Sequence, residues 1–232
     1  TLVAMRLGQS SQQLALTKSK MDKKGSRDLK AIFSKQENIN RIAFLNWRID
    51  YSSVQNLLVM ADGFMLSSIN LAKLCCEDNK DKKADIVIFP ILTNANHGIE
   101  LYLKGMTWIL NKLLGIETKI EGKHNIDQIY RTVKSKIQQL DGADGKRQFE
   151  EETKDLSEYI TELFAKVKAT PKDDKMDFSR YPFSNNYDNH FYADRIGNVE
   201  IDLDNFVDRF ETIRCKLETI SDFLYYQRLN QE

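Results

Sequence analysis

The sequence predicts an all-α protein: an up-and-down helical bundle with a short irregular or β-hairpin insertion before the last helix. Three observations lead to this prediction. Only three prolines and ten glycines interrupt the 232 residues, which leaves long segments free to form helices. In those segments the apolar residues recur every three or four positions, the period of an amphipathic helix. A hydrophobic content of 41% is enough to bury a core without disulfide bonds.

The composition also excludes several classes of protein. Lys and Arg number 34, as do Asp and Glu, so binding to nucleic acid or lipid would need a local basic patch. Cys75, Cys76 and Cys215 form neither a disulfide framework nor a zinc motif. We see no secretory leader, no membrane-spanning apolar run and no phosphate-binding or metalloprotease motif. We therefore expect a cytoplasmic protein with no membrane segment, no metal and no cofactor.

We expect two regions along the chain. Residues 1–25 form a flexible basic arm, and residues 26–232 form a single helical domain. The basic residues of the arm and the start of the domain either contact phosphate or are simply solvated, and the sequence leaves both open: Lys18, Lys20, Lys23, Lys24, Arg27 and Lys30.

The first half of the domain should contain three helices. Between residues 28 and 76 the apolar spacing predicts two, the first through Ile42, Leu45 and Ile49 and the second, longer one from Val54 to Leu71. The charged segment 77–83 is a loop. Residues 86–114 then form a strongly apolar central helix that contains Pro90 and stops at Gly115.

The second half should contain three more helices. Residues 126–140 form one, capped by His124 or Asn125, and residues 147–168 form the next, after a linker at 141–145. The aromatic segment 177–203 breaks the helical pattern, and we expect a short hairpin from residues 191–193 and 198–201. Asp202 or Asp204 then caps a last helix that runs to about Tyr226.

The polar residues of the central helix are the first candidates for a functional site. His97, Glu100 and Lys104 fall within roughly 60° of one another on a helix. Leu101 and Trp108 point the same way, so we expect the Glu100–Lys104 pair to be partly shielded from water. The alternative is an ordinary structural salt bridge between residues four apart, since most such pairs are structural.

The other candidates lie outside the central helix. His124 is either a helix cap or a site residue, and His190 lies in the aromatic loop. Pro182 restrains Tyr181, which would hold the Arg180 guanidinium in a defined place. That guanidinium could pair with Glu100 as a structural anchor, or hold the phosphate of a nucleotide while Tyr181 stacks on its base.

Three of these segments together resemble the HEPN superfamily. Residues 96–104 (NHGIELYLK) are similar to its Glu-Leu-x-x-Lys helix, residues 122–124 (GKH) to the Gly-x-His that begins its next helix, and residues 180–182 (RYP) to a loop of some bacterial branches. The resemblance covers roughly residues 50–226. It implies an all-α up-and-down bundle, a homodimer, and a setting in bacterial defence, toxin–antitoxin pairs or RNA processing.

The nuclease motif of that superfamily is missing here. Active members carry an Arg, then a polar residue, then a His a few positions further on. No Arg of this chain has a His at that spacing, and even Arg180 and His190 have nine residues between them. We therefore expect a noncatalytic domain that binds RNA, a nucleotide or a partner protein, with Glu100, Lys104, His124, Arg180 and Tyr181 as the binding residues.

Two alternatives remain open. One is a metal-independent ribonuclease in which His97 or His190 is the base and Arg180 or Lys104 stabilises the phosphorane. The other is a protein whose function depends on a second chain, which would contact the aromatic loop around residues 181–192.

Overall fold

The computed structural model describes residues 31–45, 51–117, 124–166, 187 and 199–230. The chain forms two compact units, Thr1–Trp47 and Arg48–Glu232. In the first unit the described residues contain one short 3₁₀ helix, η1 (Ile39–Arg41), which the Asn38 side chain caps. The α-helix predicted through Ile42 and Leu45 is therefore wrong over residues 31–45. Most of the large apolar side chains there are exposed, Leu45 to 77%, and a short helix is not stable in water without a surface to pack on.

The second unit confirms the all-α prediction. Its helices are α2 (Ser53–Glu77), α3 (Ala84–Leu113), α4 (Ile126–Glu152), α5 (Lys154–Lys166) and α6 (Leu203–Asp222), and η3 (Phe223–Leu229) continues α6 as a π-helix. The described residues contain no strand. Of the predicted hairpin, residues 199–201 are described and are irregular; residues 191–193 lie outside the described part of the chain.

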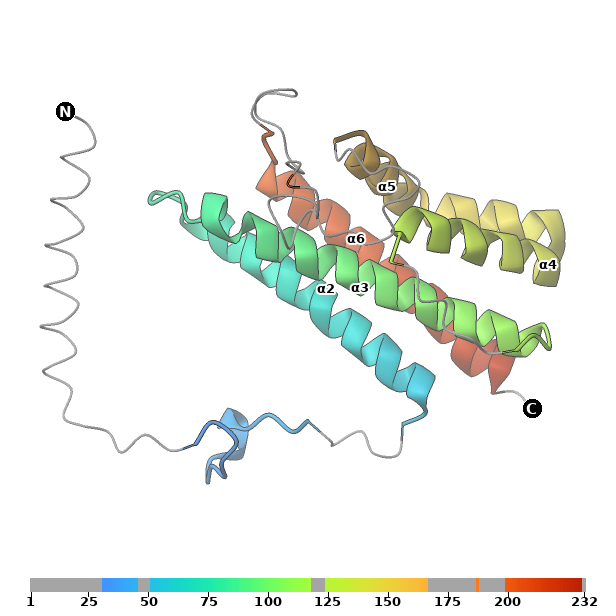
Figure 1. The fold of residues 1–232 in the computed structure, drawn as a ribbon, viewed down its shortest axis with the longest axis horizontal. Helices are drawn as coiled ribbons and strands as arrows, with labels where there is room; N and C mark the ends of the chain where they lie inside the picture. Colours follow the sequence, from blue (N-terminus) through green and yellow to red (C-terminus); the bar gives the residue numbers. More distant parts are fainter. Residues whose placement is uncertain (1–30, 46–50, 118–123, 167–186, 188–198, 231–232) are drawn as a thin grey trace, which may run out of the picture. The chain divides into compact units, whose positions relative to one another are not determined.

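Helix α3 lies at the centre of this unit, and α2 packs antiparallel beside it (Figure 1). A capping box between Ser52 and Gln55 begins α2, as such boxes commonly do. Glycine allows the two helices to approach closely, because a Cβ on Gly98 would lie 2.6 Å from Met65 Cγ and 3.0 Å from the Ala61 carbonyl oxygen. This close contact buries the face of α3 that carries Ile91, Ala95 and Tyr102.

The central helix ends where the sequence predicts. Gly115 has a φ of +66°, the left-handed conformation that glycine adopts most readily at a helix C-terminus. The amide of Ile116 donates to the carbonyl of Asn111 at 2.8 Å and so closes the last turn. Pro90 lies inside the helix, in its second turn, as predicted.

Helix α4 reverses direction at Gly142, which has a φ of +73°. On either side of this residue the chain folds back on itself: Tyr130 stacks on Phe149 at 5.6 Å, and Lys134 pairs with Glu150 at 2.9 Å. The predicted linker at 141–145 was therefore in the right place, but the turn needs only one non-helical residue. A second break at Thr153 separates α4 from α5, whereas the sequence predicts one continuous helix over residues 147–168.

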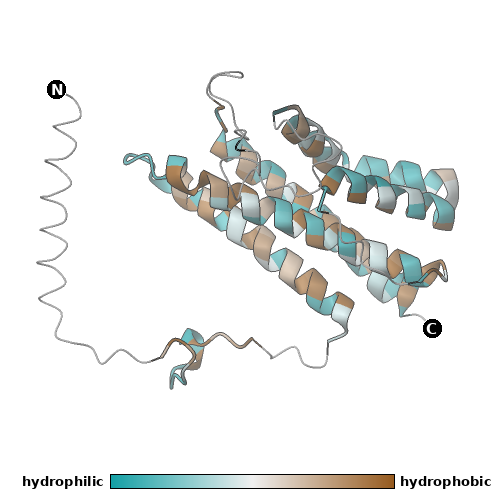
Figure 2. Cartoon of the chain, in the orientation of Figure 1, coloured by the Kyte–Doolittle hydropathy of each residue, from teal (hydrophilic) through white to brown (hydrophobic). Residues whose placement is uncertain are grey.

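The last helix packs against α2 and α3. The sequence left its cap between Asp202 and Asp204; the structure assigns it to Asp202, which accepts from the amide of Asn205. The buried face of α6 carries Phe206, Phe210, Ile213 and Leu217. Phe210 contacts the ring of Tyr159 in α5 edge-on at 4.8 Å. Figure 2 shows hydrophilic residues over much of α4 and α5, whereas hydrophobic residues run along α2.

Candidate functional site

Glu100 is a buried carboxylate in the middle of α3, only 4% exposed. Its Oε1 atom accepts a hydrogen bond from Lys104 Nζ at 2.8 Å, so the predicted pair forms and is shielded from water. The same oxygen lies 2.9 Å from Nδ1 of His124, at the start of α4. Since an ionised carboxylate can only accept, Nδ1 carries the proton of this hydrogen bond.

These neighbours keep the carboxylate ionised. Burial on its own raises the pKa of a carboxyl group, because it disfavours the charged form. Here the side chains of His97, Lys104 and His124 outweigh burial and lower the pKa of the Glu100 carboxyl to about 2. The negative charge is therefore permanent near neutral pH, and it fixes the positions of the groups that donate to it.

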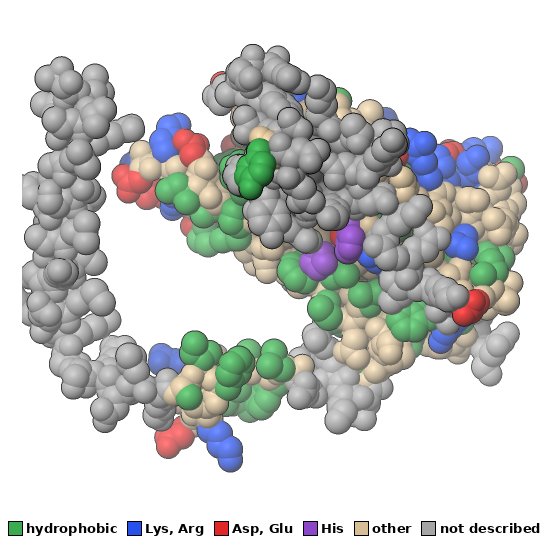
Figure 3. Space-filling model, viewed as in Figure 1, with side chains coloured by type: hydrophobic (Ala, Val, Ile, Leu, Met, Phe, Trp, Pro, Cys, Tyr) green, Lys and Arg blue, Asp and Glu red, His purple; other side chains and the backbone are tan. Residues whose placement is uncertain are grey.

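His97 completes the group, which we call the Glu100 cluster: His97, Glu100, Lys104 and His124. Nδ1 of His97 lies 3.7 Å from Glu100 Oε2, close enough for an electrostatic contact but too far for a hydrogen bond, and it is buried with no hydrogen-bond partner among the described residues. The imidazole is held instead by the ring of Phe64 in α2, edge-on at 4.5 Å. In Figure 3 the histidine surface lies beside hydrophobic side chains.

Local structure brings His124 to this place. Asn125 is 4% exposed, and its side-chain oxygen accepts from the amides of Asp127 and Gln128, which caps α4. The sequence left the cap between His124 and Asn125; the structure assigns it to Asn125. His124 is thereby left to turn towards Glu100, and the positive end of the helix macrodipole lies beside the cluster.

The other sequence-predicted residues lie outside the described part of the chain. This applies to Arg180, Tyr181 and His190, so the proposed pairing of Arg180 with Glu100 stays a prediction. What the structure brings together is His97, Glu100, Lys104 and His124, from two helices that are adjacent in sequence.

A second buried polar contact lies on α3, where Tyr159 of α5 donates to Asn96 Oδ1 at 2.9 Å.

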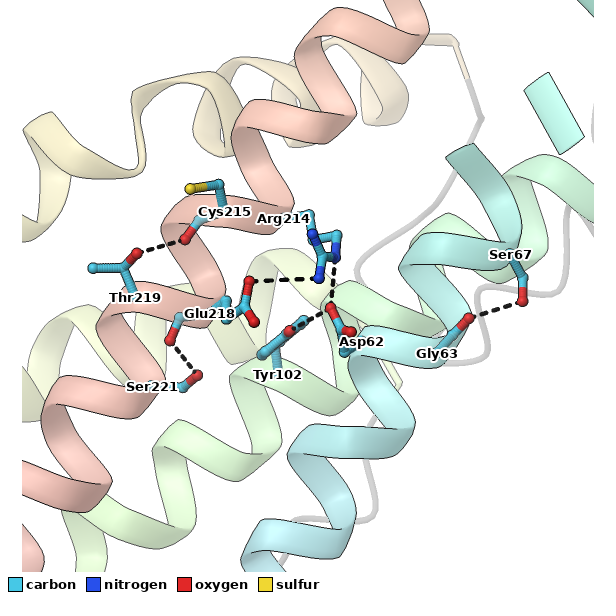
Figure 4. A network of polar contacts seen from close by, with 9 residues as sticks. All are labelled: Asp62, Gly63, Ser67, Tyr102, Arg214, Cys215, Glu218, Thr219 and Ser221. Carbon is cyan, nitrogen blue, oxygen red and sulfur yellow. Dashed lines mark hydrogen bonds and ion pairs between the residues drawn. The ribbon is translucent and has the colours of Figure 1, made fainter. Parts of the chain in front are cut away.

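Sequence reasoning missed a second polar network, on the other side of α3. Asp62 Oδ1 accepts from Arg214 Nε at 2.6 Å and from the Tyr102 hydroxyl at 3.1 Å, and Arg214 Nη2 lies 3.5 Å from Glu218 (Figure 4). The network joins α2, α3 and α6. A signal was present, because Asp62 is a carboxylate in the middle of a strongly apolar helix and so needs a partner.

The Glu100 cluster has more hydrogen-bond donors than its own acceptor can use. An ammonium has three N–H groups, and Lys104 uses one of them on Glu100. The second nitrogen of His124 is not part of its bond to Glu100, and that side chain is 47% exposed. Across the described ranges no group of His, Cys, Asp and Glu could hold a metal ion. The cluster can therefore donate to an anion, or use an oriented imidazole as an acid or base.

Comparison with protein-family models, with curated proteins and with solved structures gives no match. What the chain itself defines is an all-α bundle with a buried carboxylate shared by an ammonium and an imidazole. Of the helices in the described residues, α2 is long and apolar enough to cross a membrane, and 33% of its most apolar window is buried in the protein.

Proposed function

We propose that this protein is a HEPN-like helical domain that acts by binding a phosphate-containing ligand, either RNA or a nucleotide, at the Glu100 cluster. The observation that carries the proposal is the shared carboxylate: Oε1 of Glu100 holds Lys104 and His124 together at 2.8 and 2.9 Å. The remaining N–H groups of Lys104 suit phosphate oxygens, as does the Nε2–H that His124 carries when it is protonated, and the start of α4 adds a favourable electrostatic potential. A bacterial, cytoplasmic setting in defence or a toxin–antitoxin pair belongs to the same proposal.

Binding is favoured over catalysis because the chain lacks the Arg and His spacing of the active nucleases.

The proposed binding is tested by the fluorescence anisotropy of a labelled single-stranded RNA, with ATP as competitor. Replacing Lys104 by Gln removes the charge and keeps a donor for Glu100, so affinity should fall about tenfold and its salt dependence should weaken. The matched control is Lys112→Gln, an exposed lysine of the same helix. Equal losses in the two variants would refute the site, and absence of RNA and nucleotide binding by the wild type would refute the function.

The same geometry supports a second candidate, a metal-independent ribonuclease. A buried carboxylate that orients an imidazole is the arrangement by which many enzymes position a general base. In this version His124 takes the role that the sequence suggested for His97 or His190, and Lys104 stabilises the phosphorane. The expected activity is RNA cleavage in excess chelator that leaves cyclic phosphate ends and is lost in His124→Ala. Cleavage that persists in this variant would contradict the assignment.

We also propose that the domain functions as a homodimer, and a feature of α2 supports this. An apolar stripe runs along one flank of this helix at intervals of three, four and seven residues, the spacing of helix–helix seams. It consists of Leu57, Phe64 and Leu71, which are partly buried against the core, and of Met60 and Leu74. Met60 is 46% and Leu74 is 54% exposed. The stripe reaches the Glu100 cluster, because Phe64 contacts His97. Light scattering should give twice the chain mass, and Met60→Glu with Leu74→Glu should give the monomer.

A further inference from the structure

A cleft of about 170 Å³ lies where α2, α3, α6 and η3 meet, on the side of α3 that carries the Asp62 network. Seven of its lining residues are tyrosines and carboxylates, and we call it the tyrosine cleft: Tyr51, Tyr102, Tyr225, Tyr226, Asp62, Glu218 and Asp222. Since one water fills about 30 Å³ in the liquid, this volume suits a ligand of several heavy atoms. The cleft is separate from the Glu100 cluster, which none of these residues joins.

The charges in the cleft do not balance. Two of its three carboxylates, Asp62 and Glu218, share a single guanidinium, that of Arg214, at 2.6 Å and 3.5 Å. The side chain of Asp222 forms no hydrogen bond or ion pair with a described residue. Burial, followed by the charge of Asp62, raises the pKa of the Asp222 carboxyl, as expected where negative charges are crowded. The cleft is therefore short of positive charge.

Aromatic rings supply the rest of the lining. Tyr225 and Tyr226 follow one another in the π-helix, with ring centroids 4.9 Å apart and planes at 89°. Tyr225 is fixed by a hydrogen bond between its hydroxyl and Ser52 Oγ at 3.0 Å, whereas Tyr226 is 55% exposed. The face of a tyrosine ring attracts cations, most strongly those with weakly hydrated alkyl groups. Because the rings of Tyr225 and Tyr226 stand at right angles, they form a corner that suits a cation with alkyl groups.

We propose that the tyrosine cleft binds a small organic cation, an alkylammonium whose charge lies near Asp222 and Glu218 and whose carbon atoms lie against the tyrosine rings. A metal ion is a poorer fit. The described residues contain no group of carboxylates close enough to hold one, and two of the three carboxylates here already bind the arginine. A cation of several heavy atoms can reach separated carboxylates and also fill the volume. This binding activity does not depend on the proposed RNA site.

The test is a calorimetric titration of the full chain with choline and with propylammonium. Their neutral counterparts, 3,3-dimethylbutan-1-ol and 1-propanol, have nearly the same shape without the charge. We expect binding of at least one cation with a millimolar or lower Kd and at least tenfold weaker binding of its neutral counterpart. No binding of either cation, or equal binding of cation and alcohol, would overturn the proposal. So would magnesium or calcium binding that displaces the organic cation at equal concentration.

Two variants locate the binding in the cleft. Asp222→Asn should weaken binding about tenfold, whereas Asp208→Asn, which removes a charge from an exposed position of α6 outside the cleft, should leave it unchanged. Asp222→Asn also relieves repulsion with Asp62, so its Tm should not fall; a lower Tm would mark Asp222 as a structural residue instead. Tyr226→Leu, which keeps an apolar side chain at an exposed position, should weaken cation binding and leave the neutral alcohols unaffected. Unchanged cation affinity in both variants would overturn the assignment to this cleft.

Discussion

Nδ1 of His124 lies 2.9 Å from Oε1 of Glu100, and this contact joins the N-terminus of α4 to the middle of α3. The carboxylate that receives it is almost fully buried and also holds the Lys104 ammonium. This side chain therefore combines a structural role with the binding role proposed above, and measurement can separate the two.

Removing the carboxylate should destabilise the protein. In Glu100→Ala the ammonium of Lys104, with 10% of its side chain exposed, would stay buried without a counter-ion. We expect the free energy of unfolding to fall by about 3 kcal/mol in urea denaturation at neutral pH. Glu150→Ala removes an exposed partner of Lys134 and should change the midpoint little. Equal losses in the two variants would contradict a buried role for Glu100.

The same carboxylate should contribute to acid denaturation. Its pKa is about 2 in the folded protein and about 4.5 as an ordinary side chain. Its contribution, about 3 kcal/mol, is therefore complete above pH 4.5 and is lost as the pH falls towards 2. Unfolding free energies of the wild type and Glu100→Gln, measured from pH 7 to pH 2.5, should converge as the pH falls. A constant difference between them across this range would disprove the pKa shift.

The close contact of α2 and α3 predicts opposite results at two glycines. In Gly98→Ala the new methyl group would meet Met65 at 2.6 Å and the Ala61 carbonyl at 3.0 Å, and backbone cannot easily give way. We expect a loss of about 1–3 kcal/mol. In Gly63→Ala nothing lies within 4 Å, so the better helix propensity of alanine should stabilise the protein by up to about 1 kcal/mol. Thermal unfolding of both variants distinguishes the two outcomes. A destabilised Gly63→Ala would show that the surface of α2 around Gly63 has no room for a methyl group and would contradict the prediction.

The hydrogen bond from Tyr159 to Asn96 should hold α5 on α3. Both side chains are buried, so Tyr159→Phe leaves Asn96 Oδ1 without a donor, at a cost of about 1–3 kcal/mol. Replacing both partners, in Tyr159→Phe with Asn96→Leu, should cost less than the sum of the single variants. A double-mutant cycle in urea measures this difference. Strict additivity would mean that the bond contributes nothing to stability.

The parts of the fold that depend on neighbouring residues could be predicted from the sequence. The end of α3 at Gly115, the Asp202 cap of α6 and the Glu100–Lys104 pair each involve residues within about one helical turn. The helix predicted through Ile42 and Leu45 failed, because the same apolar spacing does not stabilise a helix whose side chains remain in water.

The sequence by itself determined that the protein is helical, where most helices begin and end, and which polar residues share a face of α3. Only the tertiary structure decided that His124 reaches Glu100 and that Asp62 meets Tyr102 and Arg214. The physical reason is that local hydrogen bonds and side-chain periodicity are properties of a single helix. A contact between helices depends on how their surfaces pack, here on the glycine that allows α2 and α3 to approach and the asparagine cap that begins α4 beside Glu100.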